Sequence, residues 1–545
     1  MNIKDWKKYF PTGSKPREQQ KEIINFVLDK FINGNKKFII VEAGTGCGKS
    51  HVAITVAKYF NDKLKESSKY KKGTWLLTTQ KILQNQYLKD FGPPKGELSS
   101  VKSSSNYKCE FFKQNRCSDS QLLIKEADPD SLFYKACSYR CKYKVSKKNF
   151  LQSEISVTNF PYFLTESSYV KKIEPRQLLV IDEGHTIEDE LSKFIEVVVS
   201  EKFAKVILEI KTPDIKDQYQ AYLWIRNEYL MALESNINEI NKEIKEIQKR
   251  GEEDTAEAKR LTTNIDKLTK HKSKIDKFIL LYDKENWVFN LIPAFQNSGR
   301  RLEFKPIDVG EYSDECLYRF GEKVLILSAT ILNKEAYCES IGIDIDKVEF
   351  LSVDSPFSTD NAPVIYLPVG DMSAQKIDDT LPDMAKTIEA ILEQHPNEKG
   401  VIHTRTFKIA NFLMKNIKNK RLITHESHNR EDIINQYIKD KKPLVLVSPS
   451  STEGLDLKDD LSRFQIICKL HWPYLGDELV QKRMEKYDYW YQYQAVKSII
   501  QARGRSIRTK DDYAVTYILD NAFERLYSKN IKMFPTYFRK SLHFD

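Results

Sequence analysis

The chain has 545 residues, a formal net charge of +10 and 41% hydrophobic residues, a composition that excludes a largely disordered protein and leaves room for several domains. No run of 18 apolar residues occurs and the segment MNIKDWKKYFPTG lacks the apolar core of a signal peptide, so we expect a cytoplasmic protein without a membrane partner. The positive charge favours a polyanionic partner such as nucleic acid.

Short apolar runs that end in polar or glycine-rich residues predict buried parallel strands in two sets. The first set is 37–44, 74–79, 177–184 and 323–330, and the second is 399–405, 443–450, 464–470 and 513–520. Segments with a helical period separate these runs, and such alternation is typical of α/β units with parallel sheets. The sequence therefore predicts two α/β domains that meet near 354–363.

A glycine-rich turn, VEAGTGCGKS, follows the first predicted strand and opens a helix. Its glycines allow backbone N–H groups to surround phosphate oxygens at the positive end of that helix. Lys49 is then expected to reach the β- and γ-phosphates of ATP and Ser50 to ligate Mg²⁺, while Cys47 is a small filler. The predicted nucleotide-binding residues of this turn are Ala43, Gly44, Thr45, Gly46, Cys47, Gly48, Lys49 and Ser50.

Four of the eight cysteines interrupt the first set of strands between about 96 and 155. They are Cys109, Cys117, Cys137 and Cys141. In a reducing compartment, clustered cysteines bind metal more often than they form disulfides. Only the last two are closely spaced, whereas zinc folds usually have two close pairs. Four thiolates can instead hold an iron–sulfur cluster, with zinc and plain buried thiols as the alternatives.

Two adjacent carboxylates end the third predicted strand, in LLVIDEGH (178–185). A strand end presents them at the carboxyl edge of the sheet, where the glycine-rich turn also lies. Asp182 is therefore the candidate Mg²⁺ partner, and Glu183 is placed to orient or deprotonate the attacking water. His185 is interpreted as coupling the nucleotide state to the segment LILSAT (325–330), with a structural histidine as the alternative.

A second interruption, from about 190 to 320, is predicted to be helical. Apolar residues step by three and four from Leu230 to Ile247, and the pattern resumes from Leu261 to Ile275 after the polar break at 249–255. This spacing predicts an antiparallel helical hairpin, or an ordinary amphipathic pair packed on the domain.

The order of these motifs resembles that of superfamily 2 helicases, specifically the iron–sulfur DinG/XPD family. Segments similar to its motifs I, Ia, II, III, V and VI are VEAGTGCGKS (41–50), LLTTQKILQNQ (76–86), VIDEGH (180–185), LILSAT (325–330), STEGLDL (451–457) and QARGRSIR (501–508). SNYKC (105–109) and VTNFPYFL (157–164) favour the DinG-like branch. Motif II reads DEGH, where the family usually has DEAH.

This resemblance implies an α/β fold of two RecA-like parallel-sheet motor domains, with a four-cysteine [4Fe–4S] insertion and a helical arch insertion in the first. The implied motor domain 1 covers 1–95, 156–192 and 319–356, the iron–sulfur domain 96–155, the arch domain 193–318 and motor domain 2 357–545.

The resemblance also implies further site residues. Arg505 and Arg508, on one helix face by their spacing, would cross to the γ-phosphate, so that hydrolysis depends on closure of the cleft; a solvated or nucleic-acid-facing helix is the alternative. The remaining nucleotide contacts would be Gln501, Gly454, Asp456, Arg17 and Gln20. The DNA contacts would be Thr79, Gln80, Asn159, Arg405 and Thr452, with Trp472 and Tyr474 as base-stacking platforms or buried aromatics.

The sequence therefore predicts a monomeric DNA helicase that uses ATP and Mg²⁺. By resemblance it moves 5′→3′ on single-stranded DNA and unwinds forked or 5′-tailed duplexes in replication, recombination or repair. Two alternatives remain open. One is an ATP-driven translocase or remodeller that does not separate strands, and the other is a non-catalytic, metal-stabilised nucleic-acid-binding module.

Overall fold

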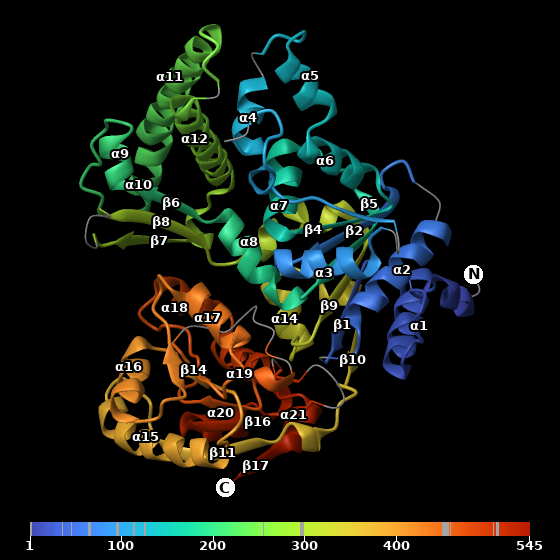
Figure 1. Cartoon of the computed structure of the whole chain (residues 1–545), viewed down its shortest axis with the longest axis vertical. Coiled ribbons are helices and arrows are strands. Elements are labelled where there is room, and N and C mark those ends of the chain that lie inside the picture. Colours follow the sequence, from blue (N-terminus) through green and yellow to red (C-terminus); the bar gives the residue numbers. More distant parts are fainter. Residues whose placement is uncertain are drawn as a thin grey trace.

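The computed structural model describes residues 3–34, 36–44, 46–63, 67–93, 97–112, 115–124, 127–253, 255–294, 299–449, 457, 459–504, 506–507 and 512–544. Within these residues the chain forms two seven-stranded sheets and one three-stranded sheet. Every strand pair in the two large sheets is parallel. Figure 1 shows the two large sheets in separate domains, with the first drawn above the second.

The first large sheet is covered by helices on both faces. Its strands, in spatial order, are β10 (Val348–Val353), β1 (Phe38–Ala43), β9 (Gly321–Ser328), β5 (Arg176–Asp182), β2 (Lys71–Thr78), β4 (Ile155–Asn159) and β3 (Leu98–Ser100). Ile39 and Val41 of β1 pack on one side with α1 (Glu18–Ile32), α2 (Lys49–Lys63) and α3 (Lys81–Phe91). Ile40 faces the other side, toward α7 (Phe160–Thr165) and α8 (Ile187–Ile195). Burial of both faces explains why these strands are continuous apolar runs.

The second large sheet has the same layered arrangement. Its strands are β13 (Leu422–Thr424), β14 (Val445–Ser448), β12 (Gly400–His403), β15 (Phe464–Ile467), β16 (Val515–Asp520), β11 (Val364–Gly370) and β17 (Leu542–Phe544). One face packs on α15 (Ile377–Gln394) and α16 (Phe407–Asn416), and the other on α19 (Trp490–Arg503), α20 (Ala522–Lys529) and α21 (Thr536–Ser541). All eight predicted strands are present in the two sheets, so the prediction of two parallel α/β domains is confirmed.

Two long helices form part of the insertion between β5 and β9. They are α11 (Leu230–Lys249) and α12 (Ala256–Leu281), which lie side by side in Figure 1. The predicted apolar positions Leu233, Ile244, Ile247, Leu261 and Ile265 are buried between them and their neighbours.

Part of the range predicted to be helical is instead a small antiparallel sheet. Its strands are β6 (Val197–Ser200), β8 (Arg301–Pro306) and β7 (Trp287–Ile292), in that order. In β8, Leu302 and Phe304 are buried and alternate with more exposed residues. This two-residue period is typical of a strand with one buried face, but it is short, and the helical period of the neighbouring segments is the stronger signal.

The cysteine region and the long helices share one apolar core. The region contains α4 (Cys117–Leu123), α5 (Leu132–Tyr139) and α6 (Lys142–Gln152), inserted between β3 and β4. Leu123 and Phe133 from this region pack with Ile247 and Leu261 of the long helices. The Gln248 side chain also donates a hydrogen bond to the Leu123 carbonyl. The two insertions of the first domain are therefore joined by side-chain packing far from the sheet.

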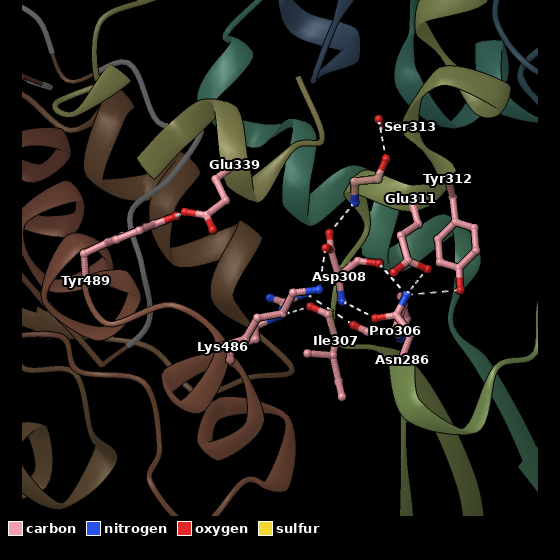
Figure 2. A network of polar contacts seen from close by, with 12 residues as sticks. Asn286, Pro306, Ile307, Asp308, Glu311, Tyr312, Ser313, Glu339, Lys486 and Tyr489 are labelled. Carbon is pink, nitrogen blue, oxygen red and sulfur yellow. Dashed lines mark hydrogen bonds and ion pairs between the residues drawn. The ribbon is translucent and has the colours of Figure 1, made fainter. Parts of the chain in front are cut away.

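Helix α18 (Glu478–Lys486) joins the second domain to the base of the insertion, as Figure 2 shows. The Lys486 ammonium lies 2.7 Å from Asp308 Oδ2, and Arg483 Nε donates to the Ile307 carbonyl at 2.9 Å. Asn286 Nδ2 donates to the Asp308 carbonyl at 3.0 Å and so holds this loop in place. Contacts along α18 thus connect the second domain to the insertion.

The central contact of this junction is a buried ion pair. Arg483 Nη1 lies 2.8 Å from Glu188 Oε1, and only 7% and 10% of the two side chains are exposed. Trp490 Nε1 donates to the same carboxylate oxygen at 3.2 Å. Removing one member of a buried pair leaves the other charge without compensation, at a typical cost of about 3–5 kcal/mol.

We therefore expect Glu188→Ala to lower the thermal unfolding midpoint strongly, as measured by calorimetry. Glu485→Ala is the matched control, because Glu485 pairs with Lys482 at 2.9 Å on the exposed face of α18, where a pair is worth at most about 1 kcal/mol. Equal midpoints for the two variants would show that the junction does not stabilise the chain.

Among the described helices, none combines the length and apolarity required to span a bilayer.

Candidate active site

The glycine-rich turn connects the end of β1 to the start of α2. Gly46 and Gly48 have φ angles of +85° and +73°, in the left-handed region that glycine adopts without strain. A Cβ at Gly46 would also lie only 1.9 Å from the Phe357 ring. The turn and its close packing therefore require glycine at this position.

Two residues at the start of α1 bind the outside of this turn. The Arg17 guanidinium donates to the Gly46 carbonyl, and Gln20 Nε2 donates to the Gly48 carbonyl at 3.3 Å. The Arg17 backbone N–H in turn donates to Gln20 Oε1 at 2.9 Å. The structure thus brings Arg17 and Gln20 to the turn, although the two segments are far apart in the sequence.

Lys49 and Cys47 occupy different environments within the turn. Lys49 Nζ donates to the Ala43 carbonyl at 3.2 Å, which holds the ammonium over the turn. Cys47 is fully buried, and its Sγ lies 3.5 Å from the Asp354 carbonyl. Burial raises the pKa of Cys47 to about 11, so it stays a neutral thiol at physiological pH.

Asp182 lies at the carboxyl end of β5 with both carboxylate oxygens hydrogen-bonded. Tyr87 OH donates to Oδ2 at 2.9 Å and the Glu183 backbone N–H donates to Oδ1 at 3.0 Å. Burial and the neighbouring Glu183 charge raise the pKa of Asp182 to about 6, although the Lys49 charge opposes this change. The lysine and the two carboxylates therefore belong to one electrostatic site.

Glu183 and His185 connect this site to the end of β9. Glu183 has a left-handed backbone with a φ of +58°, which is strained for a residue with a side chain. Its Oε2 lies 3.4 Å from His185 Nδ1, which is also 3.0 Å from Ser328 Oγ. Burial lowers the pKa of His185 to about 4, so the imidazole is neutral at pH 7. A neutral ring thus links the carboxylate to the segment LILSAT.

Helix α19 brings the second domain to the same place. Lys497 Nζ donates to the His185 carbonyl at 2.9 Å, and Tyr493 OH donates to the Ile331 carbonyl at 3.0 Å. Gln501 lies in the last turn of this helix. The predicted site residues Thr45, Thr452, Gly454, Asp456, Arg505 and Arg508 lie outside the described residues.

The candidate DNA contacts in the first domain differ in accessibility. Thr79 and Gln80 follow β2 and are partly exposed, and Gln80 is the N-cap of α3. Asn159 is buried and caps α7, where its Oδ1 accepts from the Tyr162 N–H at 3.1 Å. The structure thus gives Asn159 an internal role in addition to any contact with DNA.

The candidates in the second domain are also unlike one another. Arg405 has a φ of +64°, and its guanidinium donates a hydrogen bond to the ring of His471. Trp472 is half-buried and stacks on Tyr491 with ring centroids 4.9 Å apart, whereas Tyr474 is 79% exposed. Of the two aromatic candidates, only Tyr474 presents most of its surface to solvent.

The four candidate metal-binding cysteines lie near one another on separate elements. Cys117 Sγ and Cys141 Sγ are 3.3 Å apart, and Cys109 Sγ accepts from the Phe112 N–H at 3.3 Å. Hydrogen bonds from Cys117 and Cys137 lower the pKa of Cys141, while the pKa values of those two donors are raised. Within the described residues, no group of three or more His, Cys, Asp or Glu side chains has the arrangement of a metal site.

Comparison with known proteins supports the helicase resemblance. Family models match a helicase C-terminal domain over 388–541 and the res subunit of type III restriction enzymes over 13–223. The ATP-dependent DNA helicase DinG of Photobacterium profundum is 27% identical over 42% of this chain and 36% of its own length. A solved XPD helicase structure has a TM-score of 0.64 at 17% identity and covers 97% of this chain and 99% of its own. The chain is DinG/XPD-like.

A probable ATP-dependent helicase of Methanocaldococcus jannaschii is 26% identical over 46% of this DinG/XPD-like chain and 43% of its own length. These sequence matches therefore span less than half the length of either relative. The structural match covers nearly the whole chain, and it identifies the two parallel-sheet domains of the DinG/XPD-like chain as RecA-like.

Several residues that hold the site of this DinG/XPD-like chain together belong to none of the sequence motifs. Glu42 of β1 accepts the Ile331 and Leu332 N–H groups through Oε1, each at 2.7 Å. Its place inside an otherwise apolar strand is a signal that could have revealed it, because a buried charge requires partners. Tyr87 and Lys497 belong to no recognised spacing, and only the fold brings them to Asp182 and His185.

Proposed function

We propose that the chain is a DNA helicase that hydrolyses ATP with Mg²⁺, translocates 5′→3′ on single-stranded DNA and unwinds duplexes as a monomer. The observation that carries this proposal is the convergence of Lys49, Asp182 and Glu183 beside α19 of the second domain. An ATP site that contacts both domains can couple hydrolysis to domain movement. The choice of single-stranded DNA as the track and of 5′→3′ as the direction rests on the resemblance to DinG and XPD.

Each residue has a definite role in the proposed nucleotide site. The N–H groups of the turn and Lys49 bind the phosphates, while Ser50 and Asp182 hold Mg²⁺. When bound, Mg²⁺ would neutralise negative charge on the phosphates. Glu183 orients the attacking water. The neutral His185 ring contacts both Glu183 and Ser328, and it therefore couples the position of Glu183 to the end of β9. From the second domain, the proposed contacts are Gln501, Gly454, Asp456, Arg505 and Arg508, and on the adenine side they are Arg17 and Gln20.

The proposed strand path uses the exposed candidates first. Thr79 and Gln80 stand at the start of α3, and Tyr474 offers an exposed ring on which a base can stack. The remaining proposed contacts are Asn159, Arg405, Thr452 and Trp472. Phosphate contacts of this kind supply most of the affinity of a motor that tolerates any sequence.

We further propose a [4Fe–4S] cluster on Cys109, Cys117, Cys137 and Cys141. The support is the chemistry of the donor set, because iron–sulfur clusters require thiolates, and the structure brings Cys117 Sγ and Cys141 Sγ to 3.3 Å from each other. In this proposal 96–155 is the iron–sulfur domain and 193–318 is the arch domain. The remaining ranges, 1–95, 156–192 and 319–356, form the first motor domain, and 357–545 forms the second.

Strand displacement with defined polarity tests the function. With ATP and Mg²⁺, the protein should unwind a duplex that carries a 5′ single-stranded tail, and a matched duplex with a 3′ tail should be unwound far less. Displacement of a bound protein from single-stranded DNA without unwinding would favour the remodelling alternative. If the protein shows neither activity nor DNA-stimulated ATP hydrolysis, the motor proposal is wrong.

A further inference from the structure

Tyr87 contacts Asp182, one of the two side chains to which the proposed function assigns Mg²⁺. It lies in α3, is only 2% exposed, and donates from its hydroxyl to Asp182 Oδ2 at 2.9 Å. Ser50, at the start of α2, lies close to the same hydroxyl, where it opposes the rise in the pKa of Tyr87 that burial causes. Ser50, Tyr87 and Asp182 are therefore neighbours, and a hydrogen bond joins Tyr87 to Asp182.

Two hydrogen bonds fix the orientation of the Asp182 carboxylate. One of its oxygens is held by the Glu183 N–H, which belongs to the same strand end, and the other is held by Tyr87. Hydrogen bonds to an ionised acceptor are stronger than those between neutral groups. Without the tyrosine hydroxyl, the carboxylate would keep a single anchor and could rotate about it.

Helix α3 also begins at the proposed nucleic-acid path. Gln80 is its N-cap and Thr79 precedes it, whereas Tyr87 lies about 10 Å farther along the helix axis. Between them, the buried Gln84 donates to Ser100 Oγ and to the Val101 carbonyl. A strand that binds at the start of α3 therefore acts on a rigid element whose other end holds Asp182.

We propose that Tyr87 is a positioning residue that orients Asp182 for Mg²⁺ and transmits the position of α3 to the ATP site. In this proposal, which rests on the function proposed above, strand binding at Thr79 and Gln80 is coupled to nucleotide hydrolysis through one tyrosine hydroxyl. The nucleic-acid end of the coupling is a polyanionic strand, and the nucleotide end is Mg²⁺–ATP.

The test compares Tyr87→Phe with Tyr59→Phe. Tyr59 lies in α2 within the same apolar core and is 1% exposed, and its hydroxyl has no hydrogen-bond partner among the described residues. Both variants lose one buried hydroxyl, but only Tyr87→Phe releases Asp182. The matched pair therefore separates the positioning role from a general effect on core packing.

Binding of a fluorescent ATP analogue, titrated with Mg²⁺ and without turnover, is the first readout. Tyr87→Phe should raise the half-saturating Mg²⁺ concentration about tenfold, the change expected for one lost hydrogen bond to a charged group. It should also lower kcat for ATP hydrolysis with single-stranded DNA more than it raises KM for ATP. Tyr59→Phe should match the wild-type protein in both measurements.

Two results would overturn the inference. One is a Mg²⁺ titration and a DNA stimulation of Tyr87→Phe equal to those of Tyr59→Phe. The other is an equal loss of nucleotide affinity in chelator and in Mg²⁺ together with a lower melting temperature, which would show a merely structural role. If Lys49→Ala still removes hydrolysis in that case, only the Tyr87 inference is wrong; if Lys49→Ala has no effect, the proposed function itself is wrong.

Discussion

Replacing Lys49 with alanine should reduce DNA-stimulated ATP hydrolysis by about 10²–10³-fold, effectively to background, because the change removes a positioned charge where negative charge develops on the phosphates. Lys49 Nζ is held over the turn by the Ala43 carbonyl and lies within electrostatic reach of Asp182. Release of inorganic phosphate, measured with and without single-stranded DNA, checks this expectation.

Lys58→Ala is the matched control for this experiment. Lys58 lies on the same helix as Lys49, more than two turns away from the turn. This control should hydrolyse ATP at the wild-type rate and so exclude a general effect of losing a positive charge from α2. Wild-type turnover in Lys49→Ala would refute the assignment of the nucleotide site.

The purified protein should contain about four iron atoms per chain, and Cys141→Ala should lose them. Cys141 is the best choice because its Sγ lies only 3.3 Å from Cys117 Sγ. We expect unwinding to fall by at least about 10–100-fold, an effect typical of disrupted metal sites. ATP hydrolysis should fall much less, because its residues lie on the large sheets.

Cys338→Ala provides the matched control. Cys338 is a buried thiol outside the cysteine region, and burial raises its pKa to about 12. This variant should retain iron and unwinding. Zinc in place of iron would contradict the cluster proposal. If both variants retain unwinding equally, the four cysteines are not required for strand separation.

The sequence predicted the two large sheets because their central strands are apolar on both faces. The segment at β4 was not recognised, since its sequence ISVTN is half polar. The fold buries these polar groups with partners: Ser156 Oγ donates to the Phe150 carbonyl, and Thr158 Oγ1 donates to the Val101 carbonyl at 3.0 Å. Such compensation depends on tertiary contacts, which a pattern of apolar residues does not reveal.

The candidate site was predictable where its residues are adjacent in the sequence. The turn before Lys49 and the pair Asp182–Glu183 follow strand ends, so their position could be inferred from the order of elements alone. The supporting residues Glu42, Tyr87 and Lys497 could not be found in this way, because each reaches the site from a different element. The residues that carry the chemistry could thus be predicted from short sequence segments, whereas the residues that support them are brought to the site only by the tertiary fold.

The apolar core shared by the cysteine region and the long helices has a topological consequence. Leu123 and Phe133 on one side pack with Ile247 and Leu261 on the other. Separation of the two insertions would therefore expose apolar surface to water, which is unfavourable. If the single-stranded DNA of the proposed function passes between these insertions and the first sheet, a linear strand can enter by its free end. A circular strand has no end, so it can enter only when the shared apolar core of the two insertions opens. Circular single-stranded DNA should therefore bind to the protein more slowly than linear DNA of the same length.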